Sequence, residues 1–217
     1  MPISPAVKSP RAGLLALTAA VLSLVITPAA LAEVERPSAE QARTHIQNLG
    51  DQAIRILRQE DVRLEERERQ FREMLREDFH LKLIGYLVLG HHRREANETQ
   101  LDEFMDLFSQ FVLIRYSKLL GGYSDEKFIV TGARNSGKRD VAVQSRIVPQ
   151  HGDPLGVEWV LRKFKDGPKI IDVRVENISM VIAQRDEFNA VIQRGGFDAL
   201  IQSLRAQLET LPAEGPA

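Results

Sequence analysis

Residues 132–138, Gly-Ala-Arg-Asn-Ser-Gly-Lys, contain most of the phosphate-binding loop found in nucleotide-binding proteins. In such a loop the lysine is followed by a serine or threonine that coordinates magnesium, whereas this chain has Arg139 there. The loop must also lead into a helix whose N-terminus holds the phosphate, but residues 140–148 alternate between apolar and polar like a strand. The sequence therefore argues against nucleotide binding.

His91, His92 and Glu95 come closest to a metal site among the remaining residues. Imidazole and carboxylate groups both coordinate zinc, but their spacing here provides no convincing third ligand. Exposed histidines at the end of a helix are far more common. We predict no metal site and no cofactor.

No set of residues has the spacing of a catalytic centre. The sequence has no Gly-x-Ser-x-Gly motif, and Ser179 lacks the flanking glycine that would expose it as a nucleophile. Asp172 and Glu158 could act as bases, but alternation along their strands directs both away from the face that carries Trp159 and Val173. We predict no catalytic residue and no enzyme.

The residues between Phe128 and Glu176 are expected to form the sheet that positions any site. Apolar and polar residues alternate in four segments, at 128–131, 140–148, 157–162 and 171–176, which is the period of strands with one buried face. Turn-forming sequences separate the segments, so they should pair as an antiparallel meander. Because such a sheet needs helices on its apolar face, the fold class is α+β, with a curved sheet and several helices packed inside it.

Helical spacing marks the rest of the chain. Ser38-Ala39-Glu40-Gln41 has the shape of a capping box that begins a helix ending near Arg58, and residues 81–89 are apolar enough for a short buried segment. We interpret the charged stretch 60–78 as a solvated helix face. After the strands, one helix should stop at Gly195-Gly196, and a last helix should follow.

The helix predicted from Glu98 to Leu120 has more apolar residues than one core contact requires. They cover an arc of roughly 200° around its axis, at 100° per residue. A helix that is apolar over so wide an arc either lies deep in an ordinary core or lines an apolar cavity.

The N-terminus has the three parts of an export signal. Lys8 and Arg11 precede an apolar run from Gly13 to Ile26, and Ala30-Leu31-Ala32 provides the small residues that a signal peptidase requires. The run is shorter than the roughly 20 residues that span a bilayer, so we predict a cleaved signal peptide of residues 1–32 and not an anchor. The chain has no cysteine, which excludes a lipid-modified N-terminus and a disulfide framework.

The chain after the signal peptide is long enough to build its own core. We predict one domain over residues 33–210 and a flexible tail over residues 211–217. The formal net charge is -1, whereas a nucleic-acid surface calls for a strongly basic domain. We therefore expect no nucleic-acid partner.

Six segments, in this order along the chain, resemble the MlaC family of soluble periplasmic phospholipid carriers. They are Gly85 to Gly90, Thr99 to Leu120, Val-Glu-Trp-Val-Leu at 157–161, and residues 170–180, 185–192 and 196–204. One departure is Asn177, where the family is expected to have glycine, but asparagine also tolerates a positive φ. The resemblance implies that the acyl chains of a phospholipid or related membrane lipid are held in an apolar cavity.

The resemblance also implies periplasmic localisation and partners at both membranes. These are an inner-membrane ABC transporter complex with a substrate-binding ring and an outer-membrane complex of a lipoprotein with a porin. Two other classes stay open. One is a small-molecule enzyme on a cone-shaped α+β fold, and the other is a structural envelope protein with a filled core.

Eight residues are predicted to contact the lipid. Alternation places Val143, Trp159, Leu161 and Val173 on the apolar face of the sheet, and helical spacing places Phe104, Phe108, Phe111 and Val112 opposite them. Together they should line a pocket at or above the upper end of the roughly 300 to 1,000 Å³ that is usual for ligand sites. Arg115 either pairs with an interior carboxylate or meets a lipid phosphate near the mouth of the cavity.

Overall fold

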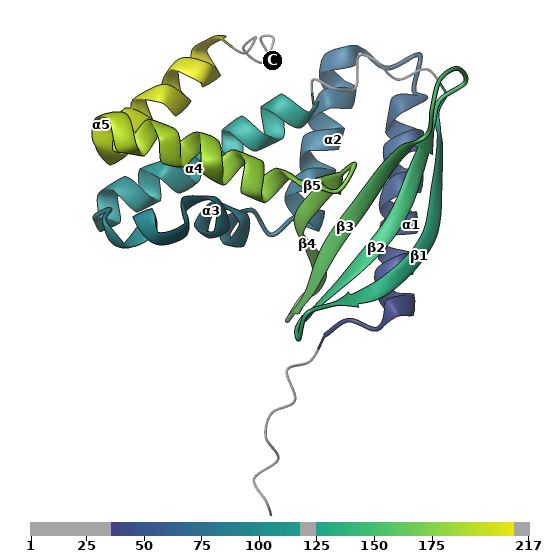
Figure 1. The fold of residues 1–217 in the computed structure, drawn as a ribbon. Helices are drawn as coiled ribbons and strands as arrows, with labels where there is room; N and C mark the ends of the chain where they lie inside the picture. Colours follow the sequence, from purple (N-terminus) through teal and green to yellow (C-terminus); the bar gives the residue numbers. More distant parts are fainter. Residues whose placement is uncertain (1–35, 118–124, 211–217) are drawn as a thin grey trace, which may run out of the picture. The chain divides into compact units, whose positions relative to one another are not determined.

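The computed structural model describes residues 36–117 and 125–210, which belong to one compact unit with an α+β fold (Figure 1). The predicted signal peptide, the predicted tail, and Leu119 and Leu120 lie outside the described residues. The helices are α1 (Ala39–Leu57), α2 (Leu64–Asp78), α3 (Leu81–Leu89), the 3-10 helix η1 (Gly90–Arg94), α4 (Glu98–Ser117) and α5 (Met180–Thr210). None of the described helices combines the length and apolar character needed to cross a membrane.

The strands form one antiparallel sheet in chain order, which confirms the predicted meander. They are β1 (Lys127–Ser136), β2 (Asp140–Val148), β3 (Leu155–Phe164), β4 (Gly167–Val175) and β5 (Ile178–Ser179). The sequence predicted four strands, and the fifth, with 2 residues, is too short to show an alternating pattern. The first strand continues past the predicted Thr131 because residues 132–136 pair with β2 instead of forming a turn.

The turn between β4 and β5 is where the sequence departs from the glycine expected in the family. Glu176 and Asn177 both have positive φ, 47° and 67°, as the two central residues of a tight hairpin turn require. Asparagine enters this region more readily than most residues, so the turn survives the substitution.

Local signals set the ends of two helices as predicted. At the start of α1, the backbone N–H of Gln41 donates to Ser38 Oγ at 3.1 Å, and the backbone N–H of Ser38 donates to Gln41 Oε1 at 2.9 Å. This is the predicted capping box. Within α5, Gly196 has φ of 75° and breaks the helical conformation, so two helical segments follow one another there.

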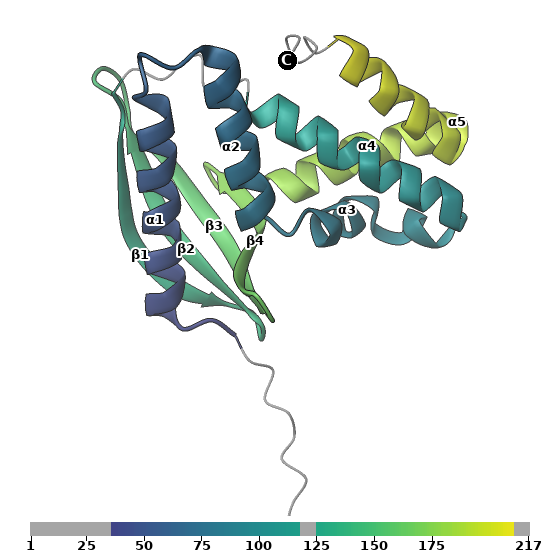
Figure 2. The ribbon, with the colours of Figure 1, turned by 180° about the vertical axis from the view of Figure 1, so that it is seen from behind.

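The helices divide into two groups. Helix α1 packs on β1 and β2, and α2 lies beside α1 on the same face of the sheet (Figure 2). Helices α3, α4 and α5 pack on one another next to β4 and β5. The β1 and β2 part of the sheet is therefore covered by α1, whereas β4 and β5 border the group formed by α3, α4 and α5.

The interior consists of two hydrophobic clusters. The first joins α3, α4 and α5 around Phe104, Phe108, Phe111 and Phe188, which are all at most 2% exposed. The second joins α1, α2 and the sheet, and includes Leu113 of α4. Phe79, at the connection between α2 and α3, packs against both clusters. We call these the helical cluster and the sheet cluster.

Candidate functional site

A cavity of about 520 Å³ lies between the helical cluster and the sheet cluster, and its wall is mostly apolar. The helical cluster contributes Ile84, Val88, Phe108 and Val181, and the sheet cluster contributes Leu49, Met74 and Leu75. The volume falls within the roughly 300 to 1,000 Å³ that is usual for ligand sites, and not at or above its upper end as the sequence suggested. Such a wall can hold a hydrocarbon but offers few groups to orient a small polar substrate.

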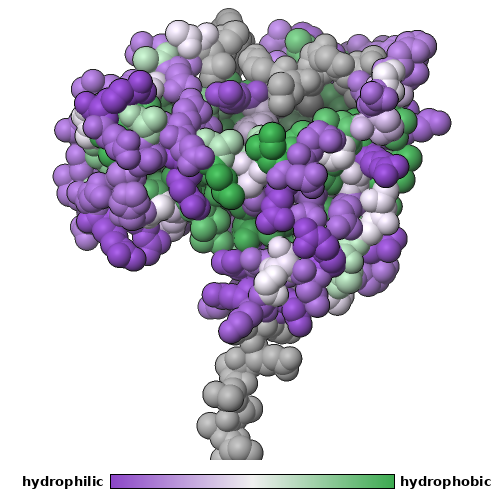
Figure 3. Space-filling view, in the orientation of Figure 1, coloured by the Kyte–Doolittle hydropathy of each residue, from purple (hydrophilic) through white to green (hydrophobic). Residues whose placement is uncertain are grey.

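Apolar side chains also reach the surface near the beginning of α5. Ile178 is 61% exposed and Ile182 is 54% exposed, and the neighbouring Met180 and Val181 line the cavity. Figure 3 shows an apolar area in this part of the surface, between the sheet and the helices. The apolar character of the cavity wall thus continues outward around the beginning of α5.

The structure places four of the eight predicted contact residues on the cavity wall. They are Phe108 and Val112 of α4, Trp159 of β3 and Val173 of β4. The two strand residues are paired with each other across β3 and β4, so their side chains share one face of the sheet. Strand alternation and helical spacing in the sequence thus correctly predicted that these four side chains lie near one another.

The other four, Phe104, Phe111, Val143 and Leu161, are not part of the wall. All are at most 2% exposed and belong to the packed clusters. Phe104 meets Phe188 and Phe197 of α5 edge to face, with ring centroids 5.9 and 6.0 Å apart. Val143 and Leu161 pack in the sheet cluster with Ala42 and Ile46 of α1. The apolar face of the sheet and the apolar arc of α4 are therefore present as predicted. Helix α1 packs on part of the face, and α5 packs on part of the arc.

Arg115 does not reach the cavity. Its side chain is exposed, and its guanidinium carbon lies 5.3 Å from the centre of the Phe111 ring. No carboxylate among the described residues forms an ion pair with it. The exposed side chain thus forms no interior ion pair among the described residues, and contact with a lipid headgroup stays a prediction. The cation on the cavity wall is Lys127, at the start of β1.

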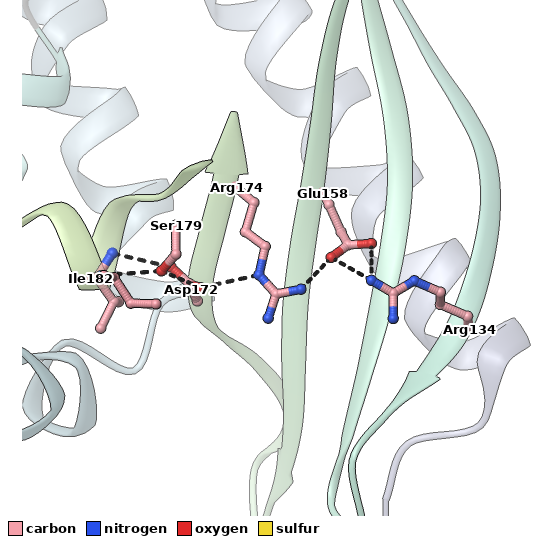
Figure 4. A network of polar contacts seen from close by, with 7 residues as sticks. Arg134, Glu158, Asp172, Arg174, Ser179 and Ile182 are labelled. Carbon is pink, nitrogen blue, oxygen red and sulfur yellow. Dashed lines mark hydrogen bonds and ion pairs between the residues drawn. The ribbon is translucent and has the colours of Figure 1, made fainter. Parts of the chain in front are cut away.

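Asp172 was predicted to point away from the apolar face, but its side chain reaches the edge of the cavity. Its Oδ2 accepts a hydrogen bond from Ser179 Oγ at 2.8 Å, and its Oδ1 accepts one from the backbone N–H of Val181 at 3.2 Å. The Ser179 hydroxyl in turn accepts from the backbone N–H of Ile182 at 3.1 Å. Asp172 and Ser179 together hold the first turn of α5 against β4 (Figure 4).

A chain of ion pairs continues from Asp172 across the sheet (Figure 4). Arg174 Nε lies 3.5 Å from Asp172 Oδ2, and Arg174 Nη1 lies 2.6 Å from Glu158 Oε1. Arg134 Nη2 donates to both oxygens of Glu158, at 2.9 and 2.7 Å. Glu158 is absent from the cavity wall, as its strand position predicted. Both candidate bases are thus occupied by cations or hydrogen-bond donors.

Tyr116, in the last turn of α4, is the phenol on the cavity wall. Burial raises the pKa of this phenol, because the charged phenolate loses its hydration in an apolar setting. The nearby Arg115 opposes this pKa shift, and the Asp172 carboxylate adds to it. The tyrosine therefore stays neutral and contributes a hydroxyl to an otherwise apolar surface.

Sequence reasoning missed the contribution of α2. The charged stretch 60–78 was interpreted as a solvated face, but Phe71, Met74 and Leu75 line the cavity. These three residues recur at helical spacing and mark one narrow apolar stripe. That stripe was the signal available in the sequence, and the thirteen charged residues of the stretch obscured it.

The remaining motifs lie away from the cavity wall. Residues 132–138 end β1 and enter the hairpin turn to β2, so the helix that a phosphate-binding loop requires does not follow them. His91, His92 and Glu95 lie at η1. One ligand atom of each residue lies within 4.8 Å of the others, which is closer than their spacing in the sequence suggested.

Comparison with known proteins agrees with this architecture. The structure is similar to that of a phospholipid-binding protein from Ralstonia solanacearum, solved in complex with a phospholipid, with a TM-score of 0.70 and 18% sequence identity. The similarity covers 79% of this chain and 98% of that chain, and at this identity it shows a common fold. The sequence matches no curated protein. The model of the MlaC protein family matches residues 47–206, and the chain therefore belongs to the MlaC family.

Proposed function

We propose that this protein is a periplasmic lipid carrier. It holds the acyl chains of a phospholipid or a related membrane lipid in the cavity and moves the lipid between the outer and inner membranes. The observation that carries the proposal is the position of a mostly apolar cavity of about 520 Å³ between two packed clusters. Family membership and the phospholipid-bound Ralstonia protein of the same fold support it.

The physical need for a carrier follows from the hydrophobic effect. Each buried methylene is worth about 0.8 kcal/mol, so two acyl chains with about 30 methylenes cost on the order of 20 kcal/mol to expose to water. A lipid of this kind does not diffuse freely between two membranes. A protein that replaces the bilayer with an apolar wall, and leaves the polar headgroup in water, removes most of this cost.

Lys127 is the side chain best placed to meet an anionic headgroup. It is exposed and lies on the cavity wall beside Phe128, which also lines the cavity. An ammonium group at this position can attract a phosphate without a dedicated pocket. We therefore propose Lys127, which lies on the cavity wall, for the headgroup contact that the sequence suggested for Arg115.

The proposal is for a binding protein and not for an enzyme. The two carboxylates considered as bases, Asp172 and Glu158, are each held by hydrogen bonds or ion pairs. The Ser179 hydroxyl both donates to Asp172 and accepts from Ile182, so it is occupied on both sides. These groups fix the beginning of α5 and the outer face of the sheet.

Export and partners complete the proposal. Signal peptide removal before Glu33 would deliver the protein to the periplasm, where it would meet the inner-membrane ABC transporter complex with its substrate-binding ring and the outer-membrane lipoprotein and porin complex. The intact mass of protein recovered from the periplasm tests the first step. A mature chain that still contains Leu14 to Ile26 would contradict it.

The direct test of cargo is a lipid extract of the protein purified without detergent. We expect one two-chain lipid for each folded protein, observed by native mass spectrometry and identified after extraction. A small metabolite in its place would support the enzyme alternative. A protein without any bound molecule, even after incubation with phospholipid vesicles, would support a structural protein with a filled core.

A further inference from the structure

The short helix η1 brings together three side chains with metal-ligand chemistry. Gly90 ends α3 with φ of 56°, a conformation that favours glycine, and the chain then turns through η1 towards α4. Within this turn His91 and His92 come close to Glu95. One ligand atom of each residue lies within 4.8 Å of the others.

His92 is the buried member of the cluster, with a side chain only 9% exposed. Its Nε2 lies 2.7 Å from Oδ1 of Asn189, on α5, and its Nδ1 lies 2.8 Å from Oε2 of Glu95. Gln193 Nε2 also donates to Asn189 Oδ1, at 3.4 Å, so both contacts use this oxygen as the acceptor. An amide oxygen only accepts, so Nε2 of His92 carries a proton and donates it to Asn189.

This hydrogen bond determines what the other nitrogen can do. With the Nε2 proton committed to Asn189, Nδ1 of His92 directs its lone pair at a carboxylate, which is also an acceptor. Two lone pairs at this distance need a positive centre between them. A proton on Nδ1 supplies one in the ion pair of His92 with Glu95, and a metal ion can replace that proton. Metal-bound histidines usually donate their second ring N–H to an oxygen, as His92 does to Asn189.

His91 provides the third donor. Its ring lies 3.9 Å from that of His92, and its Nε2 lies 3.9 Å from Oε1 of Glu95. Each carboxylate oxygen of Glu95 therefore faces one imidazole. The His91 side chain is 71% exposed, so it can adjust its rotamer without disturbing the core. Nearby Arg93 is held over the ring of Tyr86, 5.4 Å from its centre.

We propose that His91, His92 and Glu95 form a binding site for a divalent transition-metal ion, with zinc as the best match. Two histidines and one glutamate are the donor set of zinc sites that keep a fourth position open for water or another ligand. Nitrogen donors favour zinc, copper and nickel over magnesium and calcium. Asn189 is a positioning residue that holds the His92 ring. The site links η1 to α5 and does not depend on the cargo of the cavity.

Calorimetric titration of the metal-stripped mature protein, without a histidine tag, with zinc chloride tests the site. We expect one zinc ion per chain and a higher melting temperature with zinc. Replacement of His91, His92 or Glu95 by glutamine should abolish stoichiometric binding. Asn189→Ala should weaken binding by roughly 10- to 100-fold, the usual effect of losing the partner of a metal-bound histidine.

His45→Gln is the matched control. His45 Nε2 also lies near a carboxylate, 3.2 Å from Asp78 Oδ1, but it belongs to no cluster of three metal-ligating side chains among the described residues. Its zinc binding should equal that of the unchanged protein. The exposed position of His91 makes His91→Gln informative even if His92→Gln proves unstable. Unchanged stoichiometric binding in His91→Gln and Glu95→Gln, or no binding at micromolar zinc, would overturn the proposal. Cobalt in place of zinc should give the visible absorption of a low-coordinate nitrogen and oxygen site, and its absence would count against it.

Discussion

Gly50 of α1 lies directly against the ring of Phe128 on β1. A methyl group at Gly50 would come within 2.2 Å of Phe128 Cδ1 and 2.9 Å of Phe128 Cγ. Both residues line the cavity, and the Phe128 ring meets Trp159 edge to face, with centroids 6.2 Å apart. The absence of a side chain at Gly50 therefore sets the position of an aromatic part of the cavity wall.

Gly50→Ala should destabilise the protein by about 1 to 3 kcal/mol, because the Phe128 ring must move. A loss of stability would identify the clash with Phe128, because glycine to alanine inside an unobstructed helix raises the free energy of unfolding by roughly 0.5–1 kcal/mol. Denaturant unfolding measures the change. In a Phe128→Ala background the same substitution should become neutral or stabilising, and a loss of equal size in both backgrounds would show that Phe128 is not the obstacle.

Val112→Trp and Val143→Trp separate the cavity wall from the packed core. Val112 lines the cavity, so a larger side chain should displace lipid while the protein stays folded. Val143 is 0% exposed in the sheet cluster, so the same change should cost about 1 to 3 kcal/mol or more through overpacking. Native mass spectrometry reads lipid content, and a thermal melt reads stability. If both variants lost lipid equally and neither was destabilised, the assignment of Val112 to the cavity wall and Val143 to the packed core would be contradicted.

Tyr116 should report on the filling of the cavity. Its pKa is raised in the folded protein, so the stability that the neutral phenol contributes is present below its unfolded pKa of about 10 and is lost as the pH rises through its folded pKa. Lipid in the cavity removes more water and should raise this pKa further. Ultraviolet absorbance of the phenolate, with Tyr116→Phe for assignment, follows the titration. An identical titration in loaded and emptied protein would argue against lipid beside Tyr116.

Ser179→Ala should loosen the beginning of α5. The hydroxyl accepts from the backbone N–H of Ile182 and donates to Asp172, so its loss should cost about 0.5 to 2 kcal/mol, as for other helix N-caps. Hydrogen exchange should speed up at Val181 and Ile182 while α1 is unchanged. Ser136→Ala, at the end of β1, serves as the control. Unaltered exchange at Val181 would indicate that Asp172 alone holds this turn.

Lipid transfer should not depend on one ionisable side chain. Alanine at His91, His92, Asp172 or Ser179 should leave transfer between vesicles largely unchanged in protein that remains folded. In the proposed carrier, an apolar wall holds the cargo, and no acid, base or nucleophile takes part. Fluorescent phospholipid exchange measures this. Abolished transfer in one such variant with normal fold and lipid content would revive the enzyme alternative.

Features that depend on neighbouring residues were predictable from the sequence. The capping box at Ser38, the break at Gly196 and the turn at Asn177 each follow from the conformations available to a few adjacent residues. Strand alternation likewise gave the meander and the shared face of Trp159 and Val173.

The composition of the cavity wall was harder to predict because it depends on contacts between distant segments. Alternation assigned Val143 and Trp159 to one face, but it could not show that α1 covers Val143 while Trp159 remains on the wall. Helical spacing gave Phe104 and Phe108 one apolar arc, without showing that α5 fills the space around Phe104. The same limit applies to His92, whose partner Asn189 is 97 residues away in the chain.

The division of the interior into a helical cluster and a sheet cluster bears on how the protein melts. Without cargo, the cavity separates the two clusters over part of their boundary, and each keeps most of its contacts within itself. Heat should then unfold them in overlapping steps, with a calorimetric enthalpy larger than the van't Hoff enthalpy. In the proposed carrier, a bound acyl chain would touch both clusters and couple them into one cooperative transition at a higher temperature. The cargo would then act as part of the hydrophobic core that the two clusters share. Its release would make the unfolding of the protein less cooperative.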